Sequence, residues 1–253
     1  MQRAHRALRS LSLIALVITF VLPGSTRAQA AMGDTSLPQL KPQLDSMKTR
    51  FESRAPKERV DLFQGAIDDL RDSGILERAI NVGDTVPDFT LPDAVGDTVS
   101  LSAYLAQGPV VIVWYRGGWC PYCNMTLHTW VKYVPEVAAL GARMLAISPE
   151  IPDSSLSTKD KHNIPFAVLS DEGNHVARQF GIVFKLNDDL IAAYNEHFSL
   201  PEYNGDESYE LPLAATYVID TDGVIRYAFL DADYKDRAEP SQVIAALKRV
   251  MGQ

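Results

Sequence analysis

After residue 82 the chain alternates between short apolar runs and amphipathic stretches, as strands and helices packed in layers do. A continuous apolar run at 110–115 predicts a strand buried on both faces. Apolar side chains at helical spacing from Leu127 to Leu140 then predict a helix that ends at Gly141. Further strands are predicted at 143–147, 166–169, 216–219 and 224–229, and helices at 151–160, 175–180, 188–197 and 243–251. This order predicts a three-layer α/β fold with a mixed central sheet.

The region before this domain has a different pattern of apolar residues. Apolar residues at helical spacing between 44 and 75 predict two helices broken near Pro56, which form an N-terminal helical extension at 31–80 ahead of a main domain at 81–253. Extended pieces at 86–91 and 98–101 predict a small hairpin. A stretch rich in Pro, Asn, Gly and acidic residues at 200–210 predicts a long loop.

The first thirty residues have the order of a secretory signal peptide. Arg3, Arg6 and Arg9 precede an apolar run at 11–22, and small residues follow at Ala28-Gln29-Ala30. The run is shorter than the roughly 20 residues that span a bilayer, so a retained membrane anchor is the weaker alternative. We expect cleavage after Ala30 and export to a periplasm or the outside, where disulfides form.

The net charge of the chain argues against nucleic acid and anionic membranes as binding partners. The chain has 24 basic and 32 acidic residues, and its net charge is -8. Removal of residues 1–30, which hold four arginines and no acidic residue, changes the net charge to -12. Such a chain repels phosphate backbones and anionic lipid. We therefore expect neither a nucleic-acid partner nor a membrane partner once the signal peptide is removed.

The two cysteines, Cys120 and Cys123, need a chemical reason for their spacing. A disulfide between them closes a loop of four residues and is worth only about 2 kcal/mol on the chain-entropy model. A zinc site needs two more ligands, and the nearest histidine, His128, falls on another side of the predicted helix. Stabilisation and zinc binding are therefore poor explanations, and redox chemistry is the better one.

The place of the two cysteines at the start of a predicted helix suggests how they react. Pro121 suits the first position of a helix, so Cys120 is predicted to be the N-cap residue, where backbone N–H groups and the helix dipole favour a thiolate. Arg116, four residues upstream, adds positive potential. Cys123 lies one turn into the helix and is more shielded. We predict that Cys120 attacks and that Cys123 resolves the intermediate.

Three segments of the chain, in order, resemble one known family. YRGGWCPYC (115–123) after VVIVW resembles the thioredoxin-like fold. Residues 82–101 resemble the entry segment of the peroxiredoxin-like alkyl hydroperoxide reductase and thiol-specific antioxidant family, and residues 211–240 resemble the back half of its WCPYC branch. The resemblance implies a thioredoxin-like core, thiol peroxidase or thiol–disulfide exchange activity, and reduction by a thioredoxin-like electron donor.

The sequence departs from that family at the positions that support catalysis. Typical members have Pro and Thr or Ser seven and three residues before the reactive cysteine, and here these positions are Val113 and Gly117. The hydroxyl that orients a peroxide is thus missing. The family's arginine and the cis-proline of thioredoxin-like proteins both fall at Ala214, two residues after Pro212. Pro212 is therefore the candidate cis-proline, and Arg116 is a candidate for the arginine, with Arg226 as the alternative.

Other side chains near the centre have two interpretations each. Trp119 shields the thiolate or docks a partner, or else it packs at the edge of the site. Tyr115 offers a hydroxyl to the sulfur or packs at a strand end. Glu150 is a proton acceptor beneath the centre or, as we expect, a solvated loop acid. The polar residues Asp231, Asp233, Tyr234 and Arg237 are expected to form a local salt-bridged turn without a catalytic role.

Three functions follow from these observations. The first is a peroxidase in which the Cys120–Cys123 pair reduces a peroxide, and the second is an oxidoreductase that exchanges disulfides with proteins through the same pair. The third is a non-catalytic protein with a vestigial or redox-sensing pair. The sequence lacks a phosphate loop, a Ser/His/Asp set and a flavin signature, so no cofactor or metal is expected. The sequence leaves the oligomeric state open, with a homodimer as one option.

Overall fold

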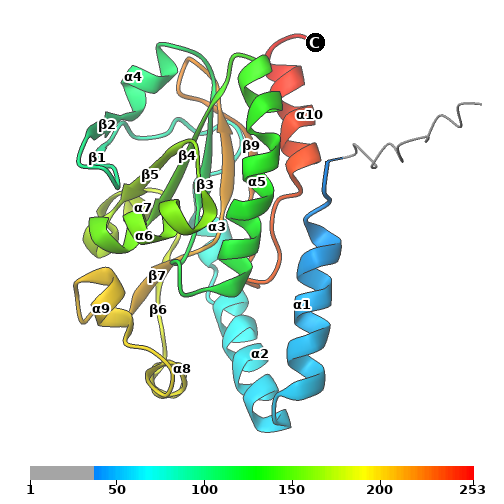
Figure 1. Ribbon diagram of the computed structural model, residues 1–253, viewed down its shortest axis with the longest axis vertical. Helices are drawn as coiled ribbons and strands as arrows, with labels where there is room; N and C mark the ends of the chain where they lie inside the picture. Colours follow the sequence, from blue (N-terminus) through cyan, green and yellow to red (C-terminus); the bar gives the residue numbers. More distant parts are fainter. Residues whose placement is uncertain (1–36) are drawn as a thin grey trace, which may run out of the picture. The chain divides into compact units, whose positions relative to one another are not determined.

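The centre of the structure is a five-stranded mixed sheet with the strand order β5-β4-β3-β8-β9 (Figure 1). We describe the computed structural model over residues 37–253. The strands of this sheet are β3 (Val110–Trp114), β4 (Arg143–Ser148), β5 (Ala167–Ser170), β8 (Thr216–Ile219) and β9 (Ile225–Phe229). All five were predicted from the apolar runs, and the mixed-sheet α/β fold is confirmed.

Strand β3 lies in the middle of the sheet because both of its faces are apolar. Every residue from Val110 to Trp114 is buried, as a strand covered on both sides requires. Its neighbours run in opposite senses, since Val111 pairs with Met144 of β4 in parallel and with Val218 of β8 in antiparallel register. The carboxyl end of β3 therefore points at the same edge of the sheet as the ends of β4 and β5.

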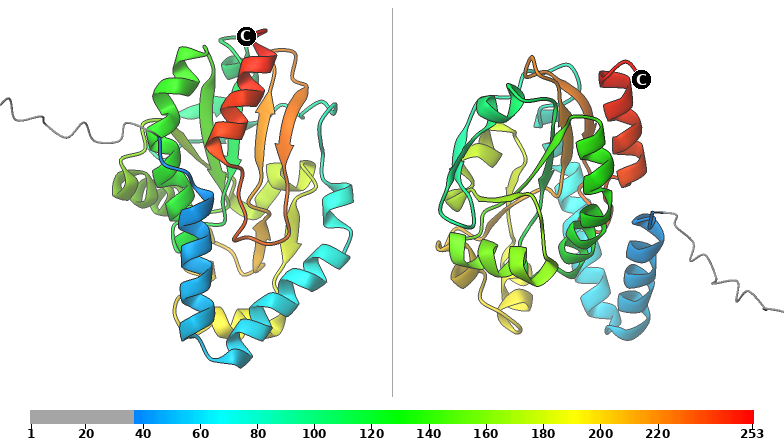
Figure 2. Two further views of the ribbon diagram at one scale, coloured as in Figure 1. Left: turned by 90° about the vertical axis from the view of Figure 1, so that its right-hand side faces the viewer. Right: turned by 45° about the horizontal axis from the view of Figure 1, so that its top comes forward.

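Helices cover the two faces of the sheet. On one face lie α5 (Pro121–Ala139) and α10 (Pro240–Val250), which run side by side (Figure 2). The other face is covered by α3 (Ile75–Arg78), α4 (Leu101–Leu105), α7 (His175–Gln179) and the hairpin of β1 (Thr90–Pro92) and β2 (Thr98–Ser100). Helix α6 (Pro152–His162) packs beside β5 at the edge. The structure thus has the predicted three layers, with helices on both faces of the sheet, and the predicted hairpin.

The N-terminal extension consists of α1 (Lys41–Arg54) and α2 (Lys57–Asp72), which meet at Pro56 as predicted. Helix α1 packs on α5, and the Glu239 carboxylate accepts hydrogen bonds from the Leu40 and Lys41 N–H groups at 3.0 and 2.9 Å. This carboxylate satisfies N–H groups that no side-chain cap serves. The extension and the sheet domain form one compact unit from Leu37 to Gln253.

The prediction of a long loop at 200–210 is wrong. The segment contains α9 (Leu200–Asn204) and leads into β7 (Glu210–Pro212), which pairs with β6 (Val183–Lys185) in a separate two-stranded sheet. Leu200 and Leu211 are buried in a third apolar cluster with α8 (Asp188–Asn195). Two apolar anchors hold the segment in place, although the residues between them are typical of a loop.

The predicted signal peptide and its cleavage site lie outside the described residues. Within residues 37–253, no helix combines the length and the apolar character that crossing a bilayer requires. The predicted boundaries at residues 30 and 80 stay predictions.

Candidate active site

The cysteine pair stands where β3 leads into α5. Cys120 is the N-cap residue of α5, with φ of -86° and ψ of 115°, and Pro121 is the first helical residue. Cys123 lies one turn further along. Both are free thiols, and their exposed fractions are 1% and 0%. The predicted placement of the pair on the helix is confirmed.

The loop before Cys120 requires two glycines. Gly117 has a φ of 151°, which disfavours residues with a side chain, and a Cβ atom there would lie 2.3 Å from Trp119 Nε1. A Cβ atom on Gly118 would lie 2.1 Å from Thr158 Oγ1 of α6. The hydroxyl that relatives place three residues before the reactive cysteine is thus absent for a steric reason.

The inner sulfur, Cys123 Sγ, accepts two hydrogen bonds from N–H donors. The Arg116 backbone N–H lies 3.4 Å away and the Arg237 guanidinium lies 3.6 Å away. Burial alone raises the pKa of this thiol, but the Cys120 thiol, Arg237 and the Arg116 N–H together bring the pKa well below its ordinary value. The hydrogen bonds at this site therefore favour the thiolate form of Cys123.

The prediction that the helix N-terminus lowers the pKa of Cys120 is wrong. Burial raises the pKa of the Cys120 thiol well above its ordinary value, and the hydrogen bond that this thiol donates to Cys123 raises it further. The Arg116 N–H and the Arg237 guanidinium are both directed to the inner sulfur. A negative charge on either sulfur disfavours a second thiolate next to it.

Arg116 is buried, with 2% of its surface exposed, and it lies among aromatic rings. Its guanidinium carbon is 5.0 Å from the centre of the Trp119 ring and 4.3 Å from that of Tyr234. The guanidinium also donates to the Tyr194 hydroxyl. Such cation–π contacts hold a buried cation close to the cysteine pair without a carboxylate.

Glu150 is a buried acid and not the solvated loop residue that we expected. It lies two residues after the end of β4 and is 0% exposed. Its Oε1 accepts the Gly118 N–H at 2.9 Å, and the Tyr115 hydroxyl donates to Oε2 at 3.4 Å. Burial raises the pKa of this carboxyl to about 7, against the effect of the Gly118 N–H. Glu150 thus anchors the loop that leads to Cys120, and Tyr115 contacts this acid.

Of the other residues predicted to support the cysteine pair, Trp119 lies in the site and Pro212 lies outside it. The Trp119 ring lies beside Cys120 and stacks on Phe198 at 4.8 Å between ring centres. Pro212 ends β7, where it pairs with Val183, and it is not among the residues that line the cavity at Cys120. Ala214, where we expected the family's arginine to fall, is buried.

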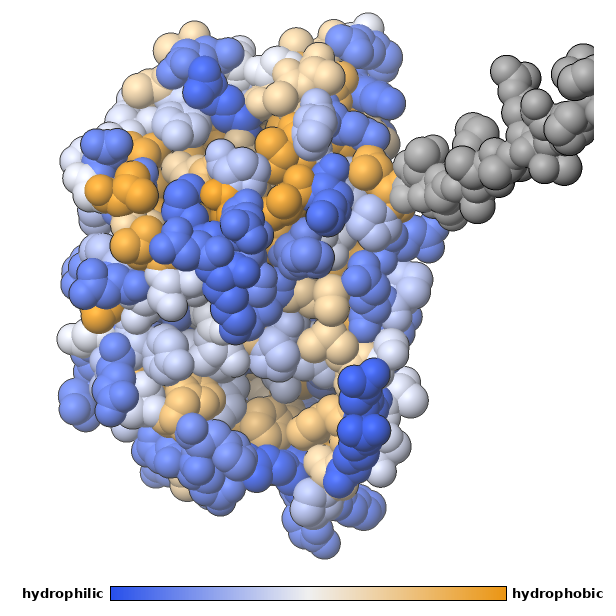
Figure 3. Space-filling view, viewed as in Figure 1, coloured by the Kyte–Doolittle hydropathy of each residue, from blue (hydrophilic) through white to orange (hydrophobic). Residues whose placement is uncertain are grey.

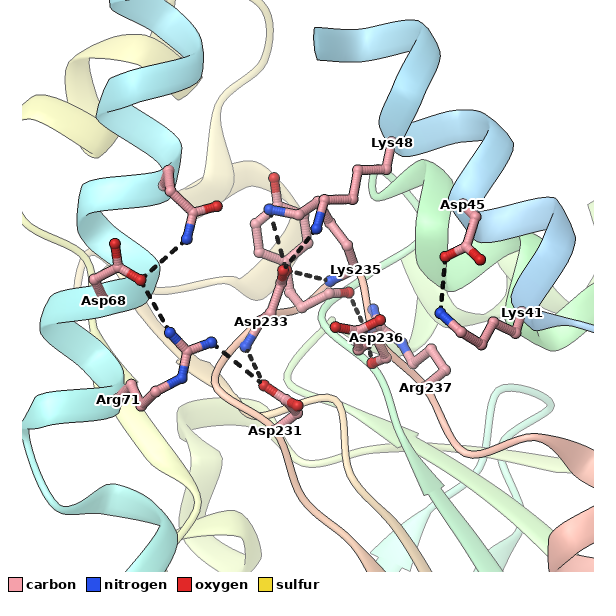
Figure 4. Close-up of polar contacts among 12 residues, drawn as sticks. Lys41, Asp45, Lys48, Asp68, Arg71, Asp231, Asp233, Lys235, Asp236 and Arg237 are labelled. Carbon is pink, nitrogen blue, oxygen red and sulfur yellow. Dashed lines mark hydrogen bonds and ion pairs between the residues drawn. The ribbon is translucent and has the colours of Figure 1, made fainter.

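Arg237 is the functional residue that sequence reasoning missed. We expected only a local salt-bridged turn at 231–237, and an ion pair of Asp233 with Lys235 is indeed present there (Figure 4). The Arg237 guanidinium, however, also donates to Tyr234 O and to Cys123 Sγ. Neither residue spacing nor local pattern relates position 237 to position 123, although both lie in segments that resemble the family.

A cavity of about 310 Å³ opens next to Cys120, whose sulfur is the outer one of the pair. Cys120, Trp119 and Tyr234 line it, and most of the other lining side chains are apolar or aromatic. Cys123 does not border this cavity. Within residues 37–253, the structure contains no group of three or more His, Cys, Asp or Glu side chains that could bind a metal ion.

Comparison with known proteins gives the fold and the site a context. The profile of the AhpC/TSA family matches residues 82–228. A chloroplastic peroxiredoxin Q of Triticum aestivum is 28% identical over 179 residues, which cover 71% of this chain and 70% of the relative. The crystal structure of peroxidoxin BcpB from Mycobacterium tuberculosis superposes with a TM-score of 0.54 and 25% identity, over 67% of this chain and 97% of that one.

A second solved structure supports the fold alone. A PrxQ variant of Xylella fastidiosa has a TM-score of 0.54 at 16% identity and covers 67% of this chain and 96% of its own. These neighbours share the thioredoxin-like arrangement described above. The profile match extends over more than half of the chain and includes β3, the cysteine pair and β8. The chain therefore belongs to the AhpC/TSA family.

Proposed function

We propose that this protein is a thiol peroxidase that reduces peroxides at the Cys120–Cys123 pair. The observation that carries the proposal is the cysteine pair itself, in which Cys120 borders a cavity and Cys123 Sγ accepts hydrogen bonds from the Arg116 N–H and the Arg237 guanidinium. Membership in the AhpC/TSA family and similarity to peroxiredoxins support this assignment.

The geometry gives each sulfur a role. Cys120 borders the cavity, and its sulfur attacks the terminal oxygen of the hydroperoxide. The Cys123 thiolate accepts the proton of Cys120. The O–O bond breaks, the alkoxide leaves and takes this proton from Cys123, and Cys120 becomes a sulfenic acid. The Cys123 thiolate then attacks the Cys120 sulfur, hydroxide leaves, and a disulfide forms. One peroxide is reduced and two thiols are oxidised.

The disulfide must be reduced before the next turnover. We propose a thioredoxin-like dithiol as the electron donor, because thiolate attack on a CxxC disulfide is the exchange reaction such proteins perform. The basic start, the short apolar run and the small residues at 28–30 support export to a periplasm or the outside. Mass spectrometry of protein from its native host should find a chain that begins at Ala31.

Two matched variants test the peroxidase. Reduced Cys123→Ser should consume one peroxide per chain, more slowly than the wild type because its base is lost, and accumulate a sulfenic acid on Cys120 that dimedone traps. Cys120→Ser should consume almost no peroxide, since its remaining thiol does not border the cavity. Dimedone adducts on Cys123 in Cys120→Ser, with none in Cys123→Ser, would reverse the two roles.

A thiol–disulfide oxidoreductase is the second candidate function. It is favoured by the CxxC pair at a helix N-terminus and by the missing hydroxyl at Gly117. Stopped-flow measurements of the reduced wild-type protein with several peroxides separate the two functions. If peroxides react no faster than with a small free thiol of similar pKa, and insulin disulfides are reduced readily, the oxidoreductase is the function.

A further inference from the structure

The two sulfurs are out of reach of another protein's thiolate in this structure. Cys120 is 1% exposed and Cys123 is 0% exposed. The cavity next to Cys120 has a volume of about 310 Å³, which admits a small molecule but no loop of a protein. A peroxide therefore has a way to Cys120 through the cavity, whereas a dithiol protein needs part of the cavity wall to move.

Helix α1 supplies a part of this wall that lies outside the family domain. Met47 and Phe51 of α1 line the cavity, whereas the family profile begins only at residue 82. Figure 3 shows charged side chains where α1 lies in Figure 1, next to a hollow with hydrophobic side chains. Without α1, the side chains of Trp119, Cys120 and Tyr122 would form an open and largely apolar surface.

Helix α1 is held more weakly than α5, the helix on which it packs. Leu44 is the single buried residue of α1, whereas α5 buries eight residues. The chain between α1 and α2 is extended at Ala55 and Pro56, with ψ of 149° and 144°. Arg59 of α2 donates to the Ala193 carbonyl of α8 at 3.1 Å and fixes α2. Elements with few buried apolar contacts open at low free energy, so α1 is the part of the wall that can turn away at this break.

One short segment, residues 231–239, connects α1 to the inner sulfur, and we call it the strap. The Asp233 carboxylate of the strap lies 3.8 Å from Lys48 of α1 (Figure 4). The Glu239 carboxylate accepts hydrogen bonds from two N–H groups at the start of α1, at 3.0 and 2.9 Å. Between these two contacts, Arg237 donates to the inner sulfur at 3.6 Å. A movement of the strap therefore affects α1 and the cysteine pair together.

The charge of Arg237 depends on the cysteine pair for an anion. Arg237 is buried, and within residues 37–253 neither Arg237 nor Arg116 forms an ion pair with a carboxylate. Arg116 lies among three aromatic rings, which stabilise its charge. The other acceptors of Arg237 are the carbonyls of Tyr234 and Asp236, which are neutral. A thiolate of the reduced pair is therefore the anion that Arg237 contacts.

Oxidation of the pair removes that anion. A disulfide carries no charge, so Arg237 becomes a buried cation without a counterion, which is a strongly unfavourable state. The strap relieves this state when Arg237 moves toward water, and the same movement takes Asp233 and Glu239 away from α1. Formation of the disulfide therefore weakens the contacts that hold α1 at the cavity.

We infer that α1 covers the docking surface of the reducing protein, and that formation of the Cys120–Cys123 disulfide releases α1 through Arg237 and the strap. The inference rests on the proposed exchange with a thioredoxin-like dithiol and adds how that protein reaches the pair. The partner docks on the apolar surface around Cys120 that α1 leaves. Because oxidation opens this surface, the partner gains access when there is a disulfide to reduce.

The exchange itself transfers two electrons. A thiolate of the donor attacks Cys120, the bond between Cys120 and Cys123 breaks, and Cys123 leaves as a thiolate. The second thiolate of the donor then attacks the donor sulfur of the mixed disulfide, and Cys120 leaves as a thiolate. The donor is oxidised to a disulfide, the pair is reduced, and the two protons of the donor thiols go to the two cysteines or to water. Arg237 then has its anion again, and α1 closes.

Hydrogen exchange of the full chain, reduced with dithiothreitol or oxidised with diamide, tests the release of α1. The amides of residues 41–54 should exchange at least about tenfold faster in the oxidised protein, and those of α6 should change less than about twofold. In Arg237→Gln the difference at 41–54 should shrink to less than about twofold, because no buried cation remains. Arg226→Gln, which removes an exposed arginine paired with carboxylates, is the matched control and should keep the difference.

The rate of disulfide reduction tests the docking surface. The diamide-oxidised chain is mixed with reduced thioredoxin or with dithiothreitol, which is small enough for the cavity. The open form stays a minority even after oxidation, so Leu44→Ala, which removes the buried anchor of α1, should speed reduction by thioredoxin at least about fivefold. Reduction by dithiothreitol should change less than about twofold. Leu105→Ala, a partly buried leucine of α4 on the other face of the sheet, is the matched control and should change neither rate.

The outcomes separate this inference from the proposed function, because neither measurement uses a peroxide. Reaction of the reduced pair with peroxides only at the rate of a free thiol would contradict the peroxidase and leave the two measurements on α1 as they are. If residues 41–54 exchange equally in both redox forms, or if Arg237→Gln keeps the full difference, the redox-linked release is overturned. If Leu44→Ala speeds both reductants equally, or neither, α1 does not cover the docking surface and the inference is wrong.

Discussion

The inner and the outer side of the cysteine pair differ in chemistry and in origin. Around Cys123 the contacts are polar, with the Arg116 N–H and the Arg237 guanidinium directed to the sulfur. Around Cys120 they are apolar and aromatic, and part of that wall comes from α1 and α2. The inner side therefore supplies the donors that favour ionisation of Cys123, and the outer side forms the cavity at Cys120.

This division explains how the pair works without the supports typical of its relatives. A threonine or serine hydroxyl cannot stand at position 117, because the loop there needs glycine. Ala214, where we expected the family's arginine, carries no charge, and the Arg237 guanidinium reaches Cys123 Sγ from a later segment. A guanidinium thus lies next to the inner sulfur.

The largest expected effect comes from Glu150, the buried acid that holds the loop before Cys120. Its pKa in the folded protein is raised to about 7, so the folded state holds its proton more tightly than the unfolded state does. The stability that this proton provides is present below about pH 4.5 and is lost as pH rises through about 7, a difference of about 3 kcal/mol. Urea unfolding across this range should show the decline in the wild type.

Glu150→Gln should remove that dependence, because glutamine accepts the Gly118 N–H without titrating. Its free energy of unfolding, relative to its own value at low pH, should exceed that of the wild type above pH 7. Glu136→Gln, an exposed acid on α5, is the matched control and should follow the wild-type curve. Parallel curves for the wild type and Glu150→Gln would mean that the carboxyl is not held in this buried state.

Arg237→Gln tests the ionisation of the inner sulfur. A hydrogen bond to a charged group is worth about 1.5–3 kcal/mol, so its loss should lower the thiolate fraction near neutral pH about tenfold or more. Thiolate absorbance against pH should show a higher apparent pKa for the pair, with partial rescue in Arg237→Lys. Arg226→Gln, which removes an exposed arginine paired with Asp220 and Asp222, is the control. An unchanged titration would contradict the role of Arg237.

Lys48→Ala should have the smallest effect and sharpens the description of the outer side. The ion pair of Lys48 with Asp233 is long, at 3.8 Å, and Lys48 is 38% exposed. We expect a change in the free energy of unfolding below about 0.5 kcal/mol, since such pairs contribute little. A loss of 2 kcal/mol or more in urea unfolding would show that charge, and not ring packing, holds α1 in place.

Much of the fold could be predicted from the sequence because the signals are local. The apolar run of β3, the N-cap position of Cys120 and the break between α1 and α2 at Pro56 depend on neighbouring residues, and all were predicted. The segment 200–210 was not, because Leu200 and Leu211 are held by a cluster formed from distant elements.

The order of the sheet strands along the chain, the place of the Cys120–Cys123 motif at a helix start and the family could be read from the sequence, because motifs and hydrophobic periodicity are local signals. The electrostatic surroundings of the pair depend on the tertiary structure. The fold buries Glu150 and brings Arg237 to Cys123 across 114 positions of sequence. Burial and long-range contacts set a pKa, and neither leaves a local pattern in the chain.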